Sequence, residues 1–143
     1  MSVNQTAQEL KADFAALSVK ERLSLLLEFS ENLPELPPKY SEHPNLLERV
    51  EECQSPIYLF VEVADSKVHL FFSAPPEAPT TRGFAGILSE VLDGQSVDEV
   101  LSLDEDFPSS LSLAEAVAPL RLRGMRAMLA RIKRQVTEKS SQT

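Results

Sequence analysis

The stretch IYLFVEVADSKVHLFFS, residues 57–73, decides the fold, because two runs of strand-forming residues flank a short polar connection. Residues 57–63 and 67–73 are rich in β-branched and aromatic side chains. The intervening Ala-Asp-Ser is short enough to predict an antiparallel hairpin. Apolar side chains that should share one buried face are Ile57, Leu59, Val61 and Val63 on the first strand, and Val68, Leu70 and Phe72 on the second.

Helical patterns precede the hairpin. Alanine and leucine spacing predicts a first helix near residues 5–17. The apolar face of this helix consists of Leu10, Phe14 and Leu17. Ser18 and Glu21 then form a capping box, in which each side chain accepts the other residue's backbone amide. This box begins a second helix that ends near Glu31. Its expected buried residues are Leu23, Leu26, Leu27 and Ser30.

A proline-rich segment, residues 33–44, follows the second helix and contains four prolines, which cannot continue it. We expect an ordered loop here. Its apolar anchors are Leu33, Leu36 and Tyr40. After the hairpin, a helix is predicted over residues 81–92, capped by Thr80 or Thr81 and ended by Gly94.

Two further helices complete the prediction. Ser96 and Glu99 form a second capping box for a short helix that ends near Leu101. The last helix is amphipathic, with apolar residues at spacings of three and four. These residues are Leu122, Met125, Leu129, Ile132 and Val136. The fold class is therefore α+β, with a small antiparallel β-sheet packed against several helices.

The composition fits one globular domain over residues 1–143, with a core of about 10–137 and flexible ends that include the tail TEKSSQT. No apolar run approaches the roughly 20 residues that span a bilayer, so we expect no membrane partner. The N-terminus lacks the pattern of a signal peptide. A single cysteine cannot form an internal disulfide, which indicates a reducing compartment, the cytoplasm.

The net charge of −8 is spread unevenly along the chain. Residues 119–143 hold seven Lys or Arg and one acid, a local charge of +6, whereas the remainder carries −14. A basic helix on an acidic body indicates either contact with a charged protein partner or a helix face that complements its own body. Nucleic-acid binding by this helix is disfavoured by the overall charge and the lack of an aromatic platform.

Most familiar chemistries are excluded by what the chain lacks. Two histidines and one cysteine cannot supply the usual ligands of a structural zinc site, and one thiol is too few for a resident iron–sulfur cluster. Phosphate-cradling glycine motifs and nucleophile elbows are absent. A Cys–His nucleophilic pair of Cys53 with His43 is conceivable but is a minor alternative.

The lone thiol, Cys53, has two interpretations. By composition alone it is buried apolar filler near a strand. Its polar neighbours Glu51, Glu52, Gln54 and Ser55, and its place between a loop and a strand, instead favour a presented side chain. A solitary thiol also suits a sulfur carrier, because a second nearby thiol would attack a persulfide and release sulfide.

The two glutamates before Cys53 bear on its ionisation. Like charge disfavours the thiolate, so Glu51 and Glu52 should raise the pKa of Cys53, unless both point into solvent, where screening leaves little effect. We also expect the thiol to be sheltered in the free protein, in a pocket supplied by the apolar strand face. Handover of sulfur would then require the loop to swing out.

Four segments together resemble the SufE family of sulfur acceptors for cysteine desulfurases. They are LPELPPKY, VEECQSPIYLFVEV, TRGFAGILSEVLDGQSVDEVLSLD and LRLRGMRAMLARI, which cover about residues 10–137 in the family's order and spacing. In this resemblance Cys53 corresponds to the acceptor cysteine at a loop tip, with Gln54 and Ser55 as its neighbours. Arg121 and Gly124 match the family's C-terminal Arg and Gly.

The resemblance implies a fold similar to IscU-type scaffolds and a function without a resident cofactor or metal. A SufS-like, PLP-dependent cysteine desulfurase would donate sulfur to Cys53 as a transient persulfide, and a SufBCD-type scaffold would receive it for iron–sulfur cluster assembly. The chain would thus be a carrier and desulfurase activator rather than an enzyme. The alternative is a binding module that modulates the desulfurase without carrying sulfur. Glu52 departs from the family's usual Gly, Tyr58 from Trp, and Arg123 from Asn.

Overall fold

The computed structural model describes residues 2–141 and has an α+β architecture. The helices are α1 (Val3–Ala15), α2 (Val19–Glu31), α3 (Pro38–Ser41), α4 (Pro79–Leu92), α5 (Val97–Ser102) and α6 (Pro119–Ser140). Short 3-10 turns occupy Pro44–Leu46 and Phe107–Ser110. The strands are β1 (Glu48–Arg49), β2 (Tyr58–Ala64) and β3 (Lys67–Ser73).

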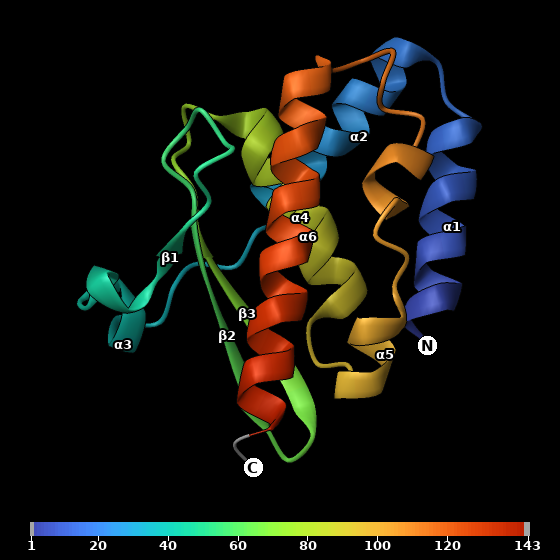
Figure 1. Cartoon of the computed structure of the whole chain (residues 1–143). Coiled ribbons are helices and arrows are strands. Elements are labelled where there is room, and N and C mark those ends of the chain that lie inside the picture. The colour runs from blue at the N-terminus through green and yellow to red at the C-terminus, as the bar shows by residue number, and fades with distance from the viewer. Residues whose placement is uncertain (1, 142–143) are drawn as a thin grey trace.

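The predicted hairpin is confirmed, and it forms most of a three-stranded antiparallel sheet of order β1-β2-β3 (Figure 1). Asp65 and Ser66 make the turn, and both have positive φ values, 53° and 62°, as a tight hairpin turn of matching twist requires. Val68 faces Val63 across the strands, and Leu70 faces Val61. Such pairs place the predicted apolar side chains on one face, although Val63 is only half-buried.

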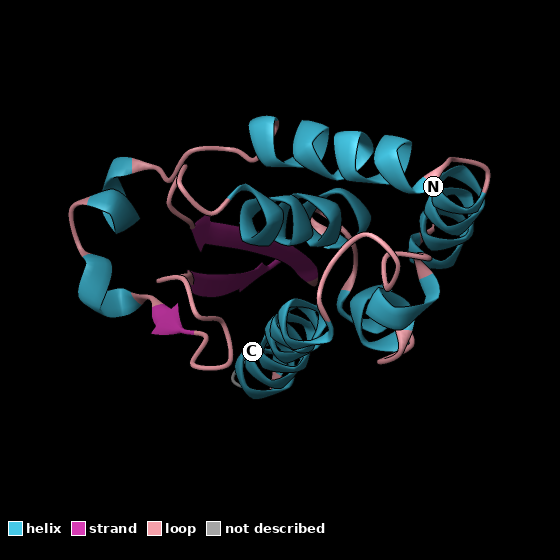
Figure 2. Ribbon diagram, turned by 90° about the horizontal axis from the view of Figure 1, so that it is seen from above, coloured by secondary structure: helices cyan, strands magenta, loops and turns pink. Residues whose placement is uncertain are grey.

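Helices cover that apolar face in layers. Both α4 and α6 lie against the sheet, and α2 lies outside α4 (Figure 2). Two glycines of α4 permit the close approach of α2: a Cβ at Gly83 would lie 2.6 Å from the Leu26 carbonyl oxygen, and one at Gly86 would lie 2.8 Å from the Phe29 carbonyl carbon. The opposite face of the sheet is covered by Tyr40, whose ring contacts two strand phenylalanines.

The predicted N-terminal limit of the core, near residue 10, is wrong. Helix α1 begins at Val3, and Val3 and Ala7 are buried in the core, because a capping box of Ser2 and Gln5 starts the helix two residues earlier than expected. The last buried residue of α6 is Val136, in agreement with the predicted C-terminal limit of the core, but the tail expected to be frayed continues the helix to Ser140. Residues 1 and 142–143 lie outside the described part of the chain.

The capping box that begins α2 is confirmed, and Leu26 and Ser30 are buried as predicted. The prediction for Leu23 is wrong, because its side chain is 37% exposed. The close contact with α4 occurs at Leu26 and Phe29, and Leu23 lies one turn before it. Leu27 is half-buried.

The segment 33–44 is ordered as expected, with Leu33 and Tyr40 buried, but it also contains the short helix α3. Strand β1 was not predicted, because two residues show no periodicity. The amphipathic pattern of α6 is confirmed: all five predicted apolar residues are buried.

Helix α4 begins differently from the prediction. Pro79 is its first residue and Ala78 precedes it without a side-chain cap, so neither Thr80 nor Thr81 caps the helix. Proline suits this position because the first helical amide has no intrahelical partner. The end is confirmed, since Gly94 has φ 79°. In α5, Ser96 accepts the Glu99 amide as predicted, but the reciprocal bond of a capping box is not formed.

Candidate functional site

The site is built on the loop that joins β1 to β2. Backbone pairing of the two strands continues past Arg49 through a hydrogen bond from the Val50 amide to the Ile57 carbonyl, 3.0 Å. The Cys53 amide donates to the Val50 carbonyl at 3.1 Å, which turns the chain back on itself. Residues 51–56 therefore form a loop that backbone hydrogen bonds close at its base. This loop lies beside the first turn of α4 and the upper part of α6 (Figure 1).

Cys53 points inward from this loop and is only 7% exposed, so the prediction of a sheltered thiol is confirmed. The shelter comes from a different element than expected. A Cβ at Gly124 would lie 2.8 Å from the Cys53 sulfur, so helix α6, rather than the strand face, closes over the thiol. Only a glycine at this position leaves room for the sulfur.

A small cavity of about 40 Å³ adjoins the sulfur, which is room for about one water molecule. Its lining residues are Glu52, Cys53, Gln54, Ser55, Thr81, Leu120, Arg121 and Gly124. The structure thus brings Arg121 to the predicted loop residues, and it leaves Glu51 outside the cavity. Thr81 and Leu120 were not predicted. They come from the first turns of α4 and α6, whose partial positive charge favours an anion nearby.

The environment holds the thiol in its protonated form. Burial, and then the charge of Glu52, raise the pKa of Cys53 to about 11, while Arg131 on α6 acts in the opposite direction. The prediction for Glu52 is confirmed in direction. Glu51 does not contribute to this pKa, because its exposed side chain lies away from the cavity.

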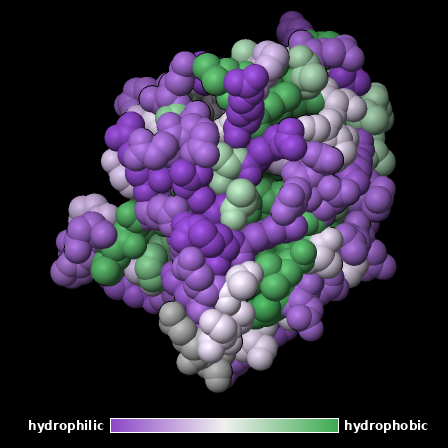
Figure 3. Space-filling view, in the orientation of Figure 1, coloured by the Kyte–Doolittle hydropathy of each residue, from purple (hydrophilic) through white to green (hydrophobic). Residues whose placement is uncertain are grey.

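Most of the basic residues of α6 bind the protein's own body. Arg126 pairs with Asp106, Arg131 with Glu48 and Glu52, and Arg134 with Glu48 and Glu138. Lys133 and Lys139 donate to the carbonyls of Leu103 and Val61. Among residues 2–141, Arg121 and Arg123 make no ion pair. The face that carries α6 is mostly hydrophilic, with separate apolar areas (Figure 3).

Other chemical sites are not found in the described part of the chain. His43 is exposed and does not line the Cys53 cavity, which removes the support for a Cys–His pair. Among residues 2–141 no group of three or more His, Cys, Asp or Glu could hold a metal ion. No helix in this range is long and apolar enough to cross a bilayer.

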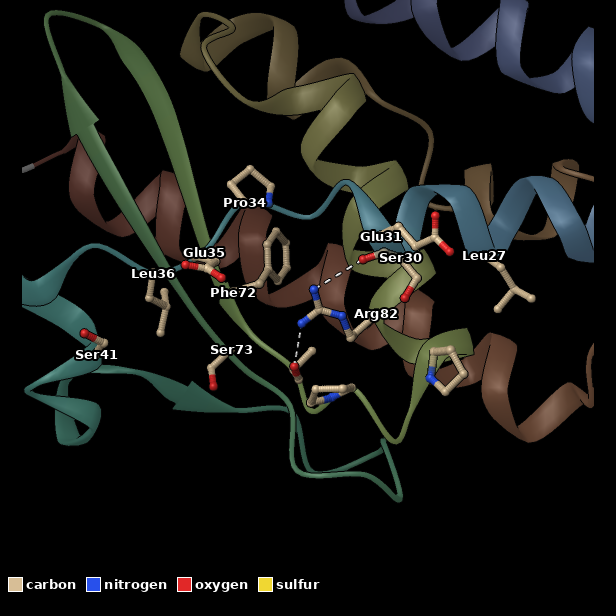
Figure 4. Close-up of a pocket in the computed structure, with 13 residues that line it drawn as sticks. Leu27, Ser30, Glu31, Pro34, Glu35, Leu36, Ser41, Phe72, Ser73 and Arg82 are labelled. Atoms are coloured by element: carbon tan, nitrogen blue, oxygen red, sulfur yellow. Dashed lines mark hydrogen bonds between the residues drawn. The ribbon is translucent and has the colours of Figure 1, made fainter.

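A larger cavity, about 820 Å³ in volume, lies on the other side of the start of α4 (Figure 4). The positively charged residue that lines this cavity, Arg82, is hydrogen-bonded within the protein. Its guanidinium donates to the Ala74 carbonyl at 2.7 Å and to the Ser30 carbonyl at 3.3 Å. Arg82 therefore ties the end of β3 to the end of α2. The larger cavity contains no thiol, so the candidate reactive site is the smaller cavity at Cys53.

A family assignment agrees with this geometry. The sequence profile of SufE, described as the Fe-S metabolism associated domain, matches residues 8–136. The chain belongs to the SufE family. Membership places it in iron–sulfur metabolism, and it confirms the resemblance seen in the sequence.

Similar proteins extend over almost the whole chain. SufE-like proteins from two strains of Mycobacterium tuberculosis are each 52% identical over 131 residues, which cover 91% of this chain and 90% of theirs. The solution structure of a hypothetical protein from Thermus thermophilus has a TM-score of 0.83 at 38% identity, covering 95% of this chain and 96% of that one. A chloroplastic/mitochondrial SufE-like protein 1 of Arabidopsis thaliana is 27% identical over 77% of this chain and 29% of its own length.

Gly124→Ala should release the thiol from its cavity. The new methyl group would lie 2.8 Å from the Cys53 sulfur, too close for both to keep their places, whereas its distances to the Cα and Cβ of Cys53, 3.8 and 3.9 Å, are ordinary contacts. We therefore expect the sulfur to be displaced. Because burial is the main cause of the raised pKa, we expect that pKa to fall and alkylation at neutral pH to be about tenfold faster. The pH profile of iodoacetamide alkylation, followed by mass spectrometry, measures both effects.

The matched control is Thr137→Ala, an exposed position on the same helix. It should leave the profile unchanged. A Gly124→Ala profile identical to that of the parent would mean that this contact does not hold the thiol.

Proposed function

We propose that the protein is a sulfur acceptor that takes persulfide sulfur onto Cys53 from a SufS-like, PLP-dependent cysteine desulfurase. The observation that supports this most is a solitary thiol on a closed loop, sheltered by Gly124 and bordered by Arg121, in a SufE-family chain. The sequence contains no other cysteine, so the chain has no thiol of its own to reduce the persulfide.

The transfer is an ordinary thiol exchange. The Cys53 thiolate attacks the outer sulfur of the persulfide on the desulfurase, and a new sulfur–sulfur bond forms on Cys53. The bond to the donor cysteine breaks, and that cysteine leaves as a thiolate. No electrons are gained or lost by the pair as a whole. The proton released from Cys53 can be taken by water or by the departing thiolate.

The sheltered position of Cys53 sets a condition on this reaction. A thiol with a pKa of about 11 is almost entirely protonated at neutral pH, so it is a poor nucleophile while buried. The loop must therefore open when the donor docks, and the pKa then returns toward that of an exposed thiol. This requirement favours transfer within a complex over reaction with free electrophiles.

Removal of sulfur from the donor cysteine would also activate the desulfurase, because it frees the active site for another turnover. In this proposal the chain is a carrier and activator rather than an enzyme, and it uses no resident cofactor. A SufBCD-type scaffold is the proposed receiver of the sulfur. The single thiol suits a reducing compartment such as the cytoplasm.

The test is mass spectrometry of the protein after incubation with a desulfurase and L-cysteine. We expect the intact mass to increase by one sulfur atom, and the increase to map to the peptide that contains Cys53 and to reverse with a reductant. Omission of L-cysteine is the control. Stimulation of the desulfurase with no sulfur on Cys53 would instead support a binding module that modulates the desulfurase.

A further inference from the structure

An ion pair connects the Cys53 loop to helix α6. Arg131 Nη1 lies 2.8 Å from Glu52 Oε1, and the Arg131 side chain is only 19% exposed. Arg131 Nε lies 3.1 Å from Glu48 Oε2, but it is buried and makes no well-aligned hydrogen bond. Glu52 is thus the closer of the two carboxylates that form ion pairs with the Arg131 guanidinium.

On the helix side of this ion pair, Arg131 is held in place by further polar contacts. Glu48, at the start of β1, also accepts hydrogen bonds from Arg134 and Gln135. The buried Gln135 in turn accepts the Val61 amide of β2 at 3.0 Å. Arg131 therefore belongs to a network that fixes α6 against two strands, and it cannot follow the loop outward without disturbing that network.

The loop side is held by much less. Within the described residues, Glu52 is the one member of the segment 51–56 whose side chain makes an ion pair or hydrogen bond. The remaining polar bonds of the closed loop are backbone bonds at Val50, Cys53 and Ile57. The Glu52–Arg131 pair is consequently the side-chain attachment nearest to the thiol.

We propose that the Glu52–Arg131 pair is a latch that keeps Cys53 in its cavity and sets how often the thiol becomes available. Opening of the loop moves Glu52 away and leaves the mostly buried Arg131 guanidinium with poorer compensation, so the closed loop is favoured. Arg131 acts here through Glu52, as a positioning residue. The importance of the latch for sulfur transfer rests on the proposed function, but its effect on access to Cys53 does not.

The two members of the latch have opposite effects on the thiol through their electric fields alone. Glu52 raises the pKa of Cys53, whereas Arg131 lowers it. If the pair acted only through these fields, removal of the Glu52 charge would accelerate alkylation and removal of the Arg131 charge would slow it. If the pair is a latch, both changes open the loop and both accelerate alkylation. The direction of the Arg131 effect therefore separates the two mechanisms.

The experiment measures iodoacetamide alkylation of the full chain at neutral pH, in the absence of any desulfurase. Glu52→Gln and Arg131→Gln should each increase the rate about three- to tenfold, and the double variant should be no faster than the faster single variant. Arg126→Gln is the matched control, because it removes the same charge from α6 at an ion pair with Asp106 that does not touch the loop. Its rate should equal that of the parent.

Each other result has a definite meaning. Slower alkylation of Arg131→Gln, or additive effects in the double variant, would overturn the latch and leave a purely electrostatic influence. Unchanged rates in both single variants would overturn it as well. If Arg131→Gln unfolds, hydrogen exchange of the Cys53 backbone amide in Glu52→Gln replaces it, because this variant changes a half-exposed side chain and should fold. An opened loop breaks the hydrogen bond of this amide to the Val50 carbonyl and speeds its exchange, whereas the loss of a charge alone leaves the exchange rate unchanged and would overturn the latch. Failure of the proposed function would appear separately, as an absence of sulfur on Cys53 of the parent protein.

Discussion

Cys53→Ser is expected to abolish the stimulation of sulfide release by the desulfurase while leaving folding and docking nearly intact. The thiolate is the attacking atom, and a serine hydroxyl is far less nucleophilic at neutral pH and cannot hold a persulfide. The smaller oxygen fits beside Gly124 where the sulfur now lies, so the loop needs no rearrangement. The change therefore removes the nucleophilic thiol and leaves the surface that would dock on the desulfurase unchanged.

The measurement is sulfide release from L-cysteine in the presence of a reductant, with complex formation followed by gel filtration. Ser55→Ala is the matched control, since it alters a neighbouring residue of the same cavity and keeps the thiol. It should retain most of the stimulation. Full stimulation by Cys53→Ser would contradict the carrier and favour a binding module.

The sequence predicts the elements of this fold better than their exact ends. Alternation over seven residues makes β3 recognisable, and repeated apolar spacing does the same for α6. Strand β1 has two residues and depends on pairing with Leu59 and Tyr58, so no local pattern announces it. The exposure of Leu23 likewise depends on where α4 contacts α2. This tertiary contact cannot be predicted from the local sequence.

The candidate site likewise contains residues that the sequence predicts and residues that only the tertiary structure brings to it. Cys53 is recognisable because it is the only cysteine, and Gln54 and Ser55 follow it in the chain. Thr81 and Arg131 come from distant helices, and nothing in their local sequence indicates that they approach the thiol. A helix prediction places Arg131 on α6 but does not say which residue faces it.

The sequence predicts the direction in which a neighbouring glutamate shifts the Cys53 pKa, but it does not show which of the two glutamates lies close enough to do so. Two adjacent acids gave one prediction for both, but adjacent loop side chains point in different directions. Glu52 turns toward α6, pairs with Arg131 and acts on the Cys53 pKa, while Glu51 does not. Arg131 of the same chain is therefore the cation that pairs with Glu52.

Gly86→Ala is expected to destabilise the fold by about 2–3 kcal/mol, although helix propensity alone favours alanine by about 1 kcal/mol. The added Cβ would lie 2.8 Å from the Phe29 carbonyl carbon and closer still to the carbonyl oxygen. Both are backbone atoms of α2, so no rotation of a side chain relieves the contact. The two helices must separate, and the apolar contacts between them weaken.

Urea unfolding measures this effect, with Glu90→Ala as the control on the exposed side of the same helix. The control should change the free energy of unfolding by no more than about 0.5 kcal/mol. Stability of Gly86→Ala equal to or above that of the parent would mean that α2 can move away from α4 at little cost. The outcome differs from that of Gly124→Ala, because there the contact is with a movable sulfur. A methyl group at Gly86 disturbs the scaffold, whereas one at Gly124 disturbs the thiol that the scaffold shelters.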